Sequence, residues 1–154
     1  AEYACNLLER MWKNYHKDMD EKVMPSTGNY KKVINLCVKS PDVDSAKKAI
    51  EYHEELEEKY ETIGNKRLRP DASTYTSLID ALVKSGHKGA GEKAEAVLNK
   101  MQDRYEAGDK SLKPNLRMIN SVINCWAKEG NGSRAEAIVG RMEDLRYQKG
   151  KGHL

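Results

Sequence analysis

Residues 94–101 read AEAVLNKM, and residues 135–142 read AEAIVGRM, a match at nearly every position. The same frame recurs as ACNLLERM at residues 4–11 and, more loosely, as AIEYHEEL at residues 49–56. Self-similarity at a fixed period is typical of proteins built from stacked repeats. The apolar positions in each copy follow the period of a helix, so the four copies predict one helix that repeats.

A second helix precedes three of these copies. It reads YKKVINLCVK at residues 30–39, YTSLIDALVK at residues 75–84 and INSVINCWAK at residues 119–128. Three sets of residues recur with a spacing of 44 or 45: Ala4, Ala49 and Ala94; Pro25, Pro70 and Pro114; Lys39, Lys84 and Lys128. Each repeat therefore has a first helix, here called the A helix, and a second, the B helix.

Proline, glycine and small polar residues predict where these helices begin and end. Proline suits the first turn of a helix but not its interior, so an A helix of about 14 residues follows each repeated proline. The breaks before the B helices, of about 20 residues each, fall at residues 40–42, 85–89 and 129–132. Asp42 and Ser133 are the expected N-caps. The sequence thus predicts seven helices and no strand, in an all-α, right-handed solenoid of stacked antiparallel hairpins.

The apolar stripes of these helices predict the core. In one hairpin they comprise Tyr75, Leu78, Ile79 and Leu82 in the A helix and Ala94, Val97, Leu98, Met101 and Tyr105 in the B helix. A single hairpin cannot cover both of its apolar faces, so neighbouring repeats are expected to stack. Ala94 and Ala135 begin their B helices where a close helix approach is expected to leave room for little more than a methyl group.

Composition excludes several classes of protein. The net charge is +3 and the isoelectric point about 8.7, less basic than histone-like proteins. The three cysteines are widely spaced, so neither a disulfide framework nor a zinc motif is expected. No run of 18 apolar residues occurs, which predicts no membrane insertion. The chain starts without methionine or a signal-peptide pattern, and we expect a fragment or a processed chain.

Catalytic patterns are not recognised in the sequence. The four histidines, at positions 16, 53, 87 and 153, share no metal-ligand spacing, and no glycine-rich phosphate loop follows a strand. The acidic run between residues 51 and 61 is interpreted as a solvated outer helix face rather than a metal cluster. We therefore predict no enzymatic activity, no cofactor, no metal site and no small-molecule substrate.

Charge differs between the two kinds of helix. The A helices are basic overall, whereas residues 42–63, a B helix, carry eight acidic and three basic side chains. Lys39, Lys84 and Lys128 end the A helices, and in layers about 10 Å apart they would form a row that can follow phosphates. The alternative is that each lysine interacts with the dipole of its own helix C-terminus. The two interpretations are not mutually exclusive.

The stretch PDASTYTSLIDALVKSG at residues 70–86, followed by AEAVLNKM, resembles a pentatricopeptide repeat, a relative of the tetratricopeptide-like helical repeats. Its units are longer than the family's usual repeat and look like the expanded repeats of algal members. The resemblance covers essentially the whole chain, 1–154. It implies a terminal B helix at 1–24 and repeats at 25–69, 70–113 and 114–150.

The resemblance also implies which residues contact RNA. In this family, one base is selected by the residue after the A-helix tyrosine together with the Asp or Asn that follows the next proline. The corresponding residues are Thr76 with Asn115, Lys31 with Asp71, and Asn120, for which no following repeat is present. The first pair resembles an adenine-reading pair, whereas Lys31 with Asp71 matches no recognised pairing.

A further feature of the family is an aliphatic residue near the start of the A helix, which sandwiches the base. The corresponding positions here hold Gly28, Ser73 and Arg117. Without that residue, much of the stacking energy, about 1 to 3 kcal/mol per base, is missing.

Two functions follow as hypotheses. The first is an organellar factor that binds single-stranded RNA on its A helices, with Lys39, Lys84 and Lys128 at phosphates. The second is a scaffold, or a subunit of a large organellar assembly, that binds another protein on the same surface. The organelle, mitochondrion or plastid, is implied by the family resemblance alone.

Overall fold

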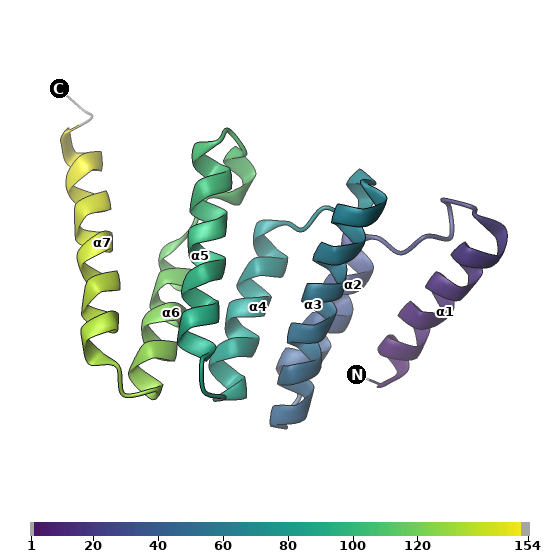
Figure 1. The fold of residues 1–154 in the computed structure, drawn as a ribbon, viewed down its shortest axis with the longest axis horizontal. Coiled ribbons are helices and arrows are strands. Elements are labelled where there is room, and N and C mark those ends of the chain that lie inside the picture. The colour runs from purple at the N-terminus through teal and green to yellow at the C-terminus, as the bar shows by residue number, and fades with distance from the viewer. Residues whose placement is uncertain (1, 152–154) are drawn as a thin grey trace. The chain divides into compact units, whose positions relative to one another are not determined.

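The computed structural model describes residues 2–151, with side chains described as far as residue 144. These residues form seven α-helices, two short 3-10 helices and no strand (Figure 1). The α-helices are α1 (Glu2–Asp18), α2 (Thr27–Lys39), α3 (Val43–Ile63), α4 (Ala72–Ser85), α5 (Ala90–Glu106), α6 (Leu116–Lys128) and α7 (Gly132–Lys151). The 3-10 helices η1 (Lys66–Leu68) and η2 (Lys110–Leu112) lie in the connectors after α3 and α5. The predicted all-α helical-repeat class is confirmed.

Each A helix and each B helix lies where the sequence predicts it. The A helices are α2, α4 and α6, and the B helices are α1, α3, α5 and α7. The chain divides into two compact units, Ala1–Ser85 and Gly86–Leu154, here called unit 1 and unit 2. The repeat ranges stay a prediction. Residue 1 of the first range and His153 lie outside the described residues.

One predicted helix cap is confirmed and one is wrong. The Ser45 backbone N–H donates to Asp42 Oδ1 at 2.6 Å, so Asp42 caps α3 as predicted. Hydrogen bonds from Ser40 and Ser45 hold the pKa of the Asp42 carboxyl well below its usual range. Ser133, however, lies inside α7. Asn131 caps that helix, because its Oδ1 accepts from the Arg134 N–H at 3.1 Å.

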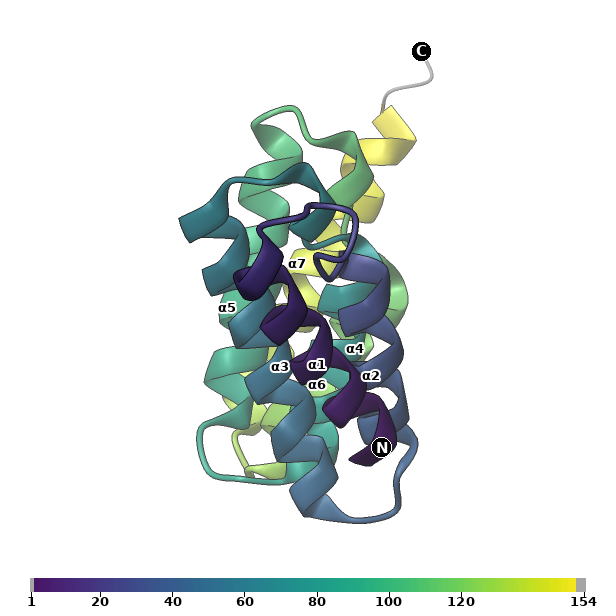
Figure 2. The same cartoon turned by 90° about the vertical axis from the view of Figure 1, so that its right-hand side faces the viewer.

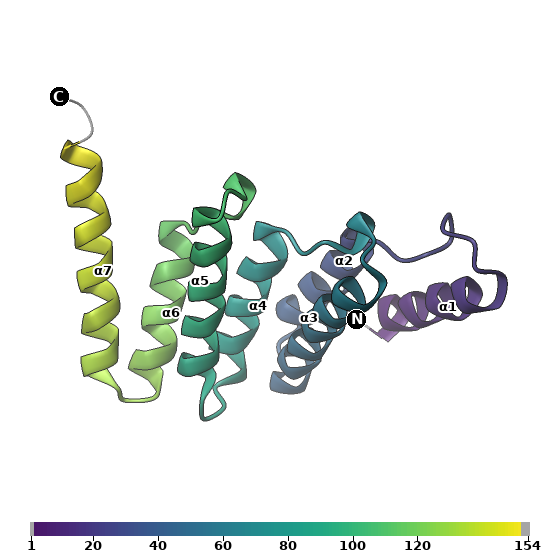
Figure 3. The same cartoon turned by 45° about the horizontal axis from the view of Figure 1, so that its top comes forward.

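In unit 1, α2 and α3 form a hairpin and α4 packs against both of them (Figure 3). The predicted apolar stripe of α4, Tyr75, Leu78, Ile79 and Leu82, is buried. Apolar residues of α2 and α3 complete this core, among them Ile34 and Leu56, which are fully buried. The prediction that A and B helices bury their apolar faces against each other is confirmed for this unit.

A chain of hydrogen bonds joins α1, α2 and α3. The Trp12 indole N–H donates to the Tyr30 hydroxyl at 2.8 Å, and that hydroxyl donates to Glu55 Oε1 at 2.6 Å. Lys59 of α3 lies 4.9 Å from the centre of the Trp12 ring, so α1, which faces the viewer in Figure 2, contacts both neighbours. Burial, together with Glu55, raises the pKa of Tyr30 far above its usual value.

The acidic run of α3 is not entirely a solvated outer face, which corrects the sequence interpretation. Glu55 accepts from Tyr30 of α2, and Glu57 accepts from the Tyr75 hydroxyl of α4. Both carboxylates are half-buried, whereas Glu51, Glu54 and Glu58 are exposed. Because A-helix tyrosines on two neighbouring helices bond to α3, the run has a structural role that its composition alone does not reveal.

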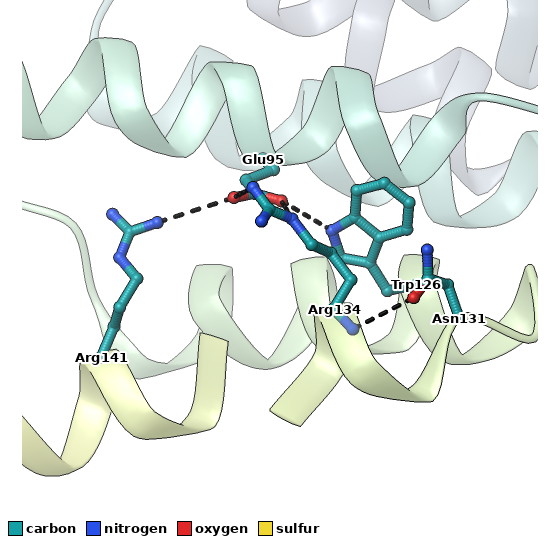
Figure 4. A network of polar contacts seen from close by, with 5 residues as sticks. All are labelled: Glu95, Trp126, Asn131, Arg134 and Arg141. Carbon is teal, nitrogen blue, oxygen red and sulfur yellow. Dashed lines mark hydrogen bonds and ion pairs between the residues drawn. The ribbon is translucent and has the colours of Figure 1, made fainter. Parts of the chain in front are cut away.

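Unit 2 contains a polar network centred on the buried side chain of Glu95 in α5 (Figure 4). Arg134 of α7 donates to both carboxylate oxygens, at 2.6 and 2.9 Å, and the Trp126 indole N–H of α6 donates to Oε2 at 2.9 Å. Arg141 adds a longer ion pair at 3.9 Å. One carboxylate thus connects all three helices of the unit, and its bidentate pairing fixes their relative positions.

A close helix approach in this unit occurs at a glycine, in addition to the alanines singled out in the sequence. A Cβ atom at Gly91 would lie 2.7 Å from two atoms of the Trp126 ring. Ala94 is fully buried, as predicted, but Ala135 is only half-buried, so it does not have the tight environment expected of it. Val97 and Tyr105 of the predicted α5 stripe are also half-buried, while Leu98 and Met101 are buried.

Replacing Gly91 with alanine tests this approach. The Trp126 ring is anchored by its bond to Glu95, so Gly91→Ala should destabilise unit 2 by about 1 to 3 kcal/mol. Gly140→Ala in α7 is the matched control, because nothing lies within 4 Å of its Cβ position, and it should stabilise by about 0.5 to 1 kcal/mol. Urea denaturation followed by Trp126 fluorescence, in a Trp12→Phe background, measures both. Equal effects of the two changes would contradict the packing.

The hydrogen-bond chain of unit 1 gives a second prediction. Tyr30→Phe leaves the Trp12 N–H without its acceptor and Glu55 without its donor, so it should cost about 1 to 3 kcal/mol. Tyr3→Phe is the control, since Tyr3 is 81% exposed.

Because the Tyr30 pKa is raised in the folded state, wild-type stability should hold below pH 10 and fall above it. That additional alkaline loss should be absent in Tyr30→Phe. Urea titrations across pH that show no difference would contradict the assignment.

Candidate nucleic-acid interface

Each A helix carries a row of residues along one face that are polar except for Gly28. We call these rows the polar stripes. Their members recur three or four residues apart, which keeps them on one helix face. They are Gly28, Lys31, Asn35 and Lys39 in α2; Ser73, Thr76, Asp80 and Lys84 in α4; and Arg117, Asn120, Asn124 and Lys128 in α6. All four stripe residues of α6 are exposed, whereas those of α4 are half-buried.

Polar contacts hold α2 and α4 side by side and parallel. Near their starts, the Thr27 hydroxyl donates to the Arg69 carbonyl at 2.8 Å. In the middle, the Ser77 hydroxyl donates to Asn35 Oδ1 at 2.6 Å. Near their ends, Lys84 Nζ donates to the Val38 carbonyl at 2.6 Å. Since these contacts occur in the same order along both helices, the stripes of α2 and α4 run in the same direction next to each other.

Lys84 interacts with the preceding A helix rather than with its own. Its ammonium donates to the carbonyls of Val38 and Ser40, at the C-terminal end of α2. A cation at this end is favoured by the helix dipole and satisfies carbonyls that lack a partner within the helix. The sequence analysis expected Lys84 to interact with the dipole of its own helix. It instead interacts with the C-terminus of the neighbouring helix, α2. An ammonium has three donors, so one is left for a ligand.

The same contact places two members of the lysine row together. Lys84 bonds to the backbone on either side of Lys39, and Lys39 is exposed as the last residue of α2. Lys128 is likewise exposed at the end of α6 in unit 2. The end of α2 therefore carries two lysines, whereas Lys128 at the end of α6 is followed by the exposed Glu129.

The residues expected to read bases lie on or next to the stripes. Lys31 is half-buried on α2, and Asn120 is exposed on α6. Three others already bond to their own helix: Thr76 Oγ1 donates to the Ala72 carbonyl at 2.8 Å, Asp71 Oδ1 accepts from the Thr74 N–H at 2.8 Å, and Asn115 Oδ1 accepts from the Met118 N–H at 3.0 Å. Asp71 and Asn115 are thus helix caps. Base reading by these five residues stays a prediction.

Sequence reasoning missed the residues that connect neighbouring helices. Asn35 and Ser77 bond across the α2–α4 contact, and both stand out as polar residues between apolar neighbours in their helices. In unit 2, Glu129 at the end of α6 accepts from the Gly91 N–H at 2.8 Å, and so caps α5, whose own N-cap residue is a glycine. A glycine at an N-cap offers no side-chain acceptor, so the first N–H groups of the helix are open to an acceptor from elsewhere.

The described part of the chain contains neither a metal-ligand cluster nor an exposed cysteine. No group of three or more His, Cys, Asp or Glu side chains there could hold a metal ion. All three cysteines are free and buried. Burial raises the pKa of the Cys37 and Cys125 thiols to about 11, so both are protonated near neutral pH, as expected of core thiols.

Comparison with known proteins agrees with these features. A family model described as the pentacotripeptide-repeat region of PRORP matches residues 7–146. The chain belongs to this family. The predicted pentatricopeptide-repeat resemblance is therefore confirmed. Neither the curated proteins nor the solved structures contain a significant match. Among the described residues, no helix has the length and apolar character needed to cross a membrane.

Substituting Lys84 tests its contact with α2. Lys84→Met keeps the aliphatic stem but removes the donors, so it should destabilise unit 1 by about 1 to 2 kcal/mol. Lys39→Met is the matched control at the same position of the preceding repeat, where the side chain is exposed, and it should leave stability unchanged within about 0.5 kcal/mol. Urea denaturation followed by Trp12 fluorescence measures the difference. A smaller loss for Lys84→Met than for Lys39→Met would contradict the contact.

Proposed function

We propose that this repeat chain is a non-catalytic scaffold that binds single-stranded RNA on the polar stripes of its A helices. The observation that carries the proposal lies at the end of α2, where the Lys84 ammonium bonds to the carbonyls of Val38 and Ser40, on either side of the exposed Lys39. Membership of a pentatricopeptide-repeat family supports a binding role. By the same family membership, we propose an organellar location, in a mitochondrion or plastid.

Charge favours the A helices over the B helices as the RNA-binding layer. The stripes of α2 and α6 carry Lys31, Lys39, Arg117 and Lys128 and no carboxylate. The exposed face of α3 carries Glu51, Glu54 and Glu58 in contrast, and it repels phosphates. An RNA strand is therefore attracted to the stripes of α2 and α6 more than to the acidic face of α3.

In this proposal, Lys39, Lys84 and Lys128 contact phosphates. Lys84 uses two donors to hold α2 in place and offers the third to the ligand, so its structural and binding roles are combined in one ammonium. Thr76, Asn115, Asn120, Lys31 and Asp71 lie close to the bound strand.

A protein ligand on the same surface is the second candidate. Leu36 of α2 and Leu116 of α6, next to the stripes, are 46% and 52% exposed. Exposed aliphatic side chains beside polar residues are typical of surfaces that bind proteins. A ligand of this kind would lose affinity on truncation of these leucines rather than of the lysines.

The test is an RNA-binding titration over a series of salt concentrations. Lys39→Gln combined with Lys128→Gln should weaken binding to every RNA sequence and flatten the slope of log affinity against log salt by about 1.4, at about 0.7 per lost phosphate contact. Lys47→Gln combined with Lys48→Gln on α3 removes the same charge from the other layer and should change the slope much less. A wild-type chain without measurable RNA affinity at low salt would favour the protein-ligand candidate.

A further inference from the structure

We infer that the polar stripes bind RNA by its phosphate backbone, with nearly the same affinity whatever its bases. The inference rests on the proposed function and defines its ligand more closely. Proteins select unpaired bases by stacking them on flat or apolar side chains and by hydrogen bonds to the base edges. Both kinds of contact require side chains that reach out from the binding surface.

The aromatic side chains of the A helices do not reach out in this way. Each A helix has one, and each contacts a B helix: Tyr30 and Tyr75 contact α3, and Trp126 contacts α5. Tyr30 and Tyr75 are 0% and 1% exposed, and their hydroxyls donate to glutamates of α3. The Trp126 ring lies against Gly91 and its N–H donates to Glu95. Tyr30 and Tyr75 are therefore unavailable to stack on a base, and the half-buried Trp126 ring is held against α5.

The stripe positions themselves offer little apolar surface. None of the twelve residues is aromatic, and none is valine, leucine, isoleucine or methionine. Leu36 and Leu116 border the stripes, because Leu36 precedes Lys39 by three residues and Leu116 precedes Asn120 by four. Arg117 carries the one guanidinium of the stripes, a group that binds phosphate as readily as it stacks.

Hydrogen bonds inside the protein also limit base-edge recognition. Thr76 donates its only hydroxyl proton to the Ala72 carbonyl, which leaves an acceptor alone. Asn115 and Asp71 each have one oxygen occupied by a backbone N–H at the start of their helix. Selecting a base requires donors and acceptors presented together, and each of these three side chains already has one of its hydrogen-bonding groups in use within the protein.

The stripes also carry positive charge. Lys39 is exposed between two residues whose carbonyls accept from Lys84, and Arg117 and Lys128 are exposed at the two ends of the α6 stripe. About 16 Å separates the Cα atoms of Arg117 and Lys128, at the rise of an α-helix. Cations without stacking platforms recognise the regular charge of the backbone, which is the same in every sequence.

The experiment compares four single strands of about 12 nucleotides, a length within the range that such surfaces bind. They are oligouridine, oligocytidine, an unstructured mixed sequence, and an abasic ribose-phosphate strand. Anisotropy titrations with the wild-type chain should give dissociation constants within about threefold of one another, and equal salt slopes. Each base stacked on the protein would instead weaken the abasic strand by about five- to 150-fold.

Variants of the stripes separate the possible causes. Thr76→Val and Arg117→Lys, which remove a hydroxyl and a flat cation, should leave the ratios among the four strands unchanged within about twofold. Lys39→Gln should weaken all four strands by one common factor, because each loses a phosphate contact. A preference of more than tenfold for one strand, abolished by Thr76→Val or Arg117→Lys, would overturn this inference alone. Failure of the wild-type chain to bind any strand would overturn the proposed function as well.

Discussion

The contact between α2 and α4 is the constraint on which the candidate interface depends. Three polar bonds, at Thr27, Asn35 and Lys84, hold these A helices parallel in unit 1. With this spacing fixed, the apolar side of each A helix faces the B helices. Tyr30 and Tyr75 then reach α3 from either side, where Glu55 and Glu57 accept their hydroxyl protons. The remaining side of each A helix is the polar stripe, so the helix contact that gives stability also determines what a ligand meets.

A common feature of both units is that residues of one helix complete the end of another. Lys84 of α4 supplies a cation to the C-terminus of α2, and Glu129 of α6 supplies an acceptor to the N-terminus of α5. Unsatisfied backbone groups at helix ends are thereby paired through stacking of helices rather than within each helix. Such contacts favour one register between neighbouring helices, because a shift of one residue would separate the charged group from its partners.

The parts of this fold that follow from local chemistry were predictable, and those that depend on packing partners were not. Repeated prolines and glycine-rich breaks locate all seven helices, and Asp42 caps α3 as its side chain predicts. Ser133 is a suitable capping residue by type, but Asn131 has the position that lets its amide oxygen reach the Arg134 N–H. The lysine ladder was visible as a 44- to 45-residue spacing, whereas its contact with the preceding helix required the packing of α4 on α2.

The most direct test of the account is to map by NMR where RNA touches the chain. A titration of the isotope-labelled protein with an unstructured RNA strand at low salt should shift amide and lysine side-chain signals along the stripes of α2, α4 and α6, most strongly around Lys39 and Lys128. Signals from the exposed acidic face of α3, around Glu51 and Glu58, should stay unchanged. Shifts confined to α3 or α7, or no shifts at RNA concentrations well above that of the protein, would contradict a binding surface on the A helices.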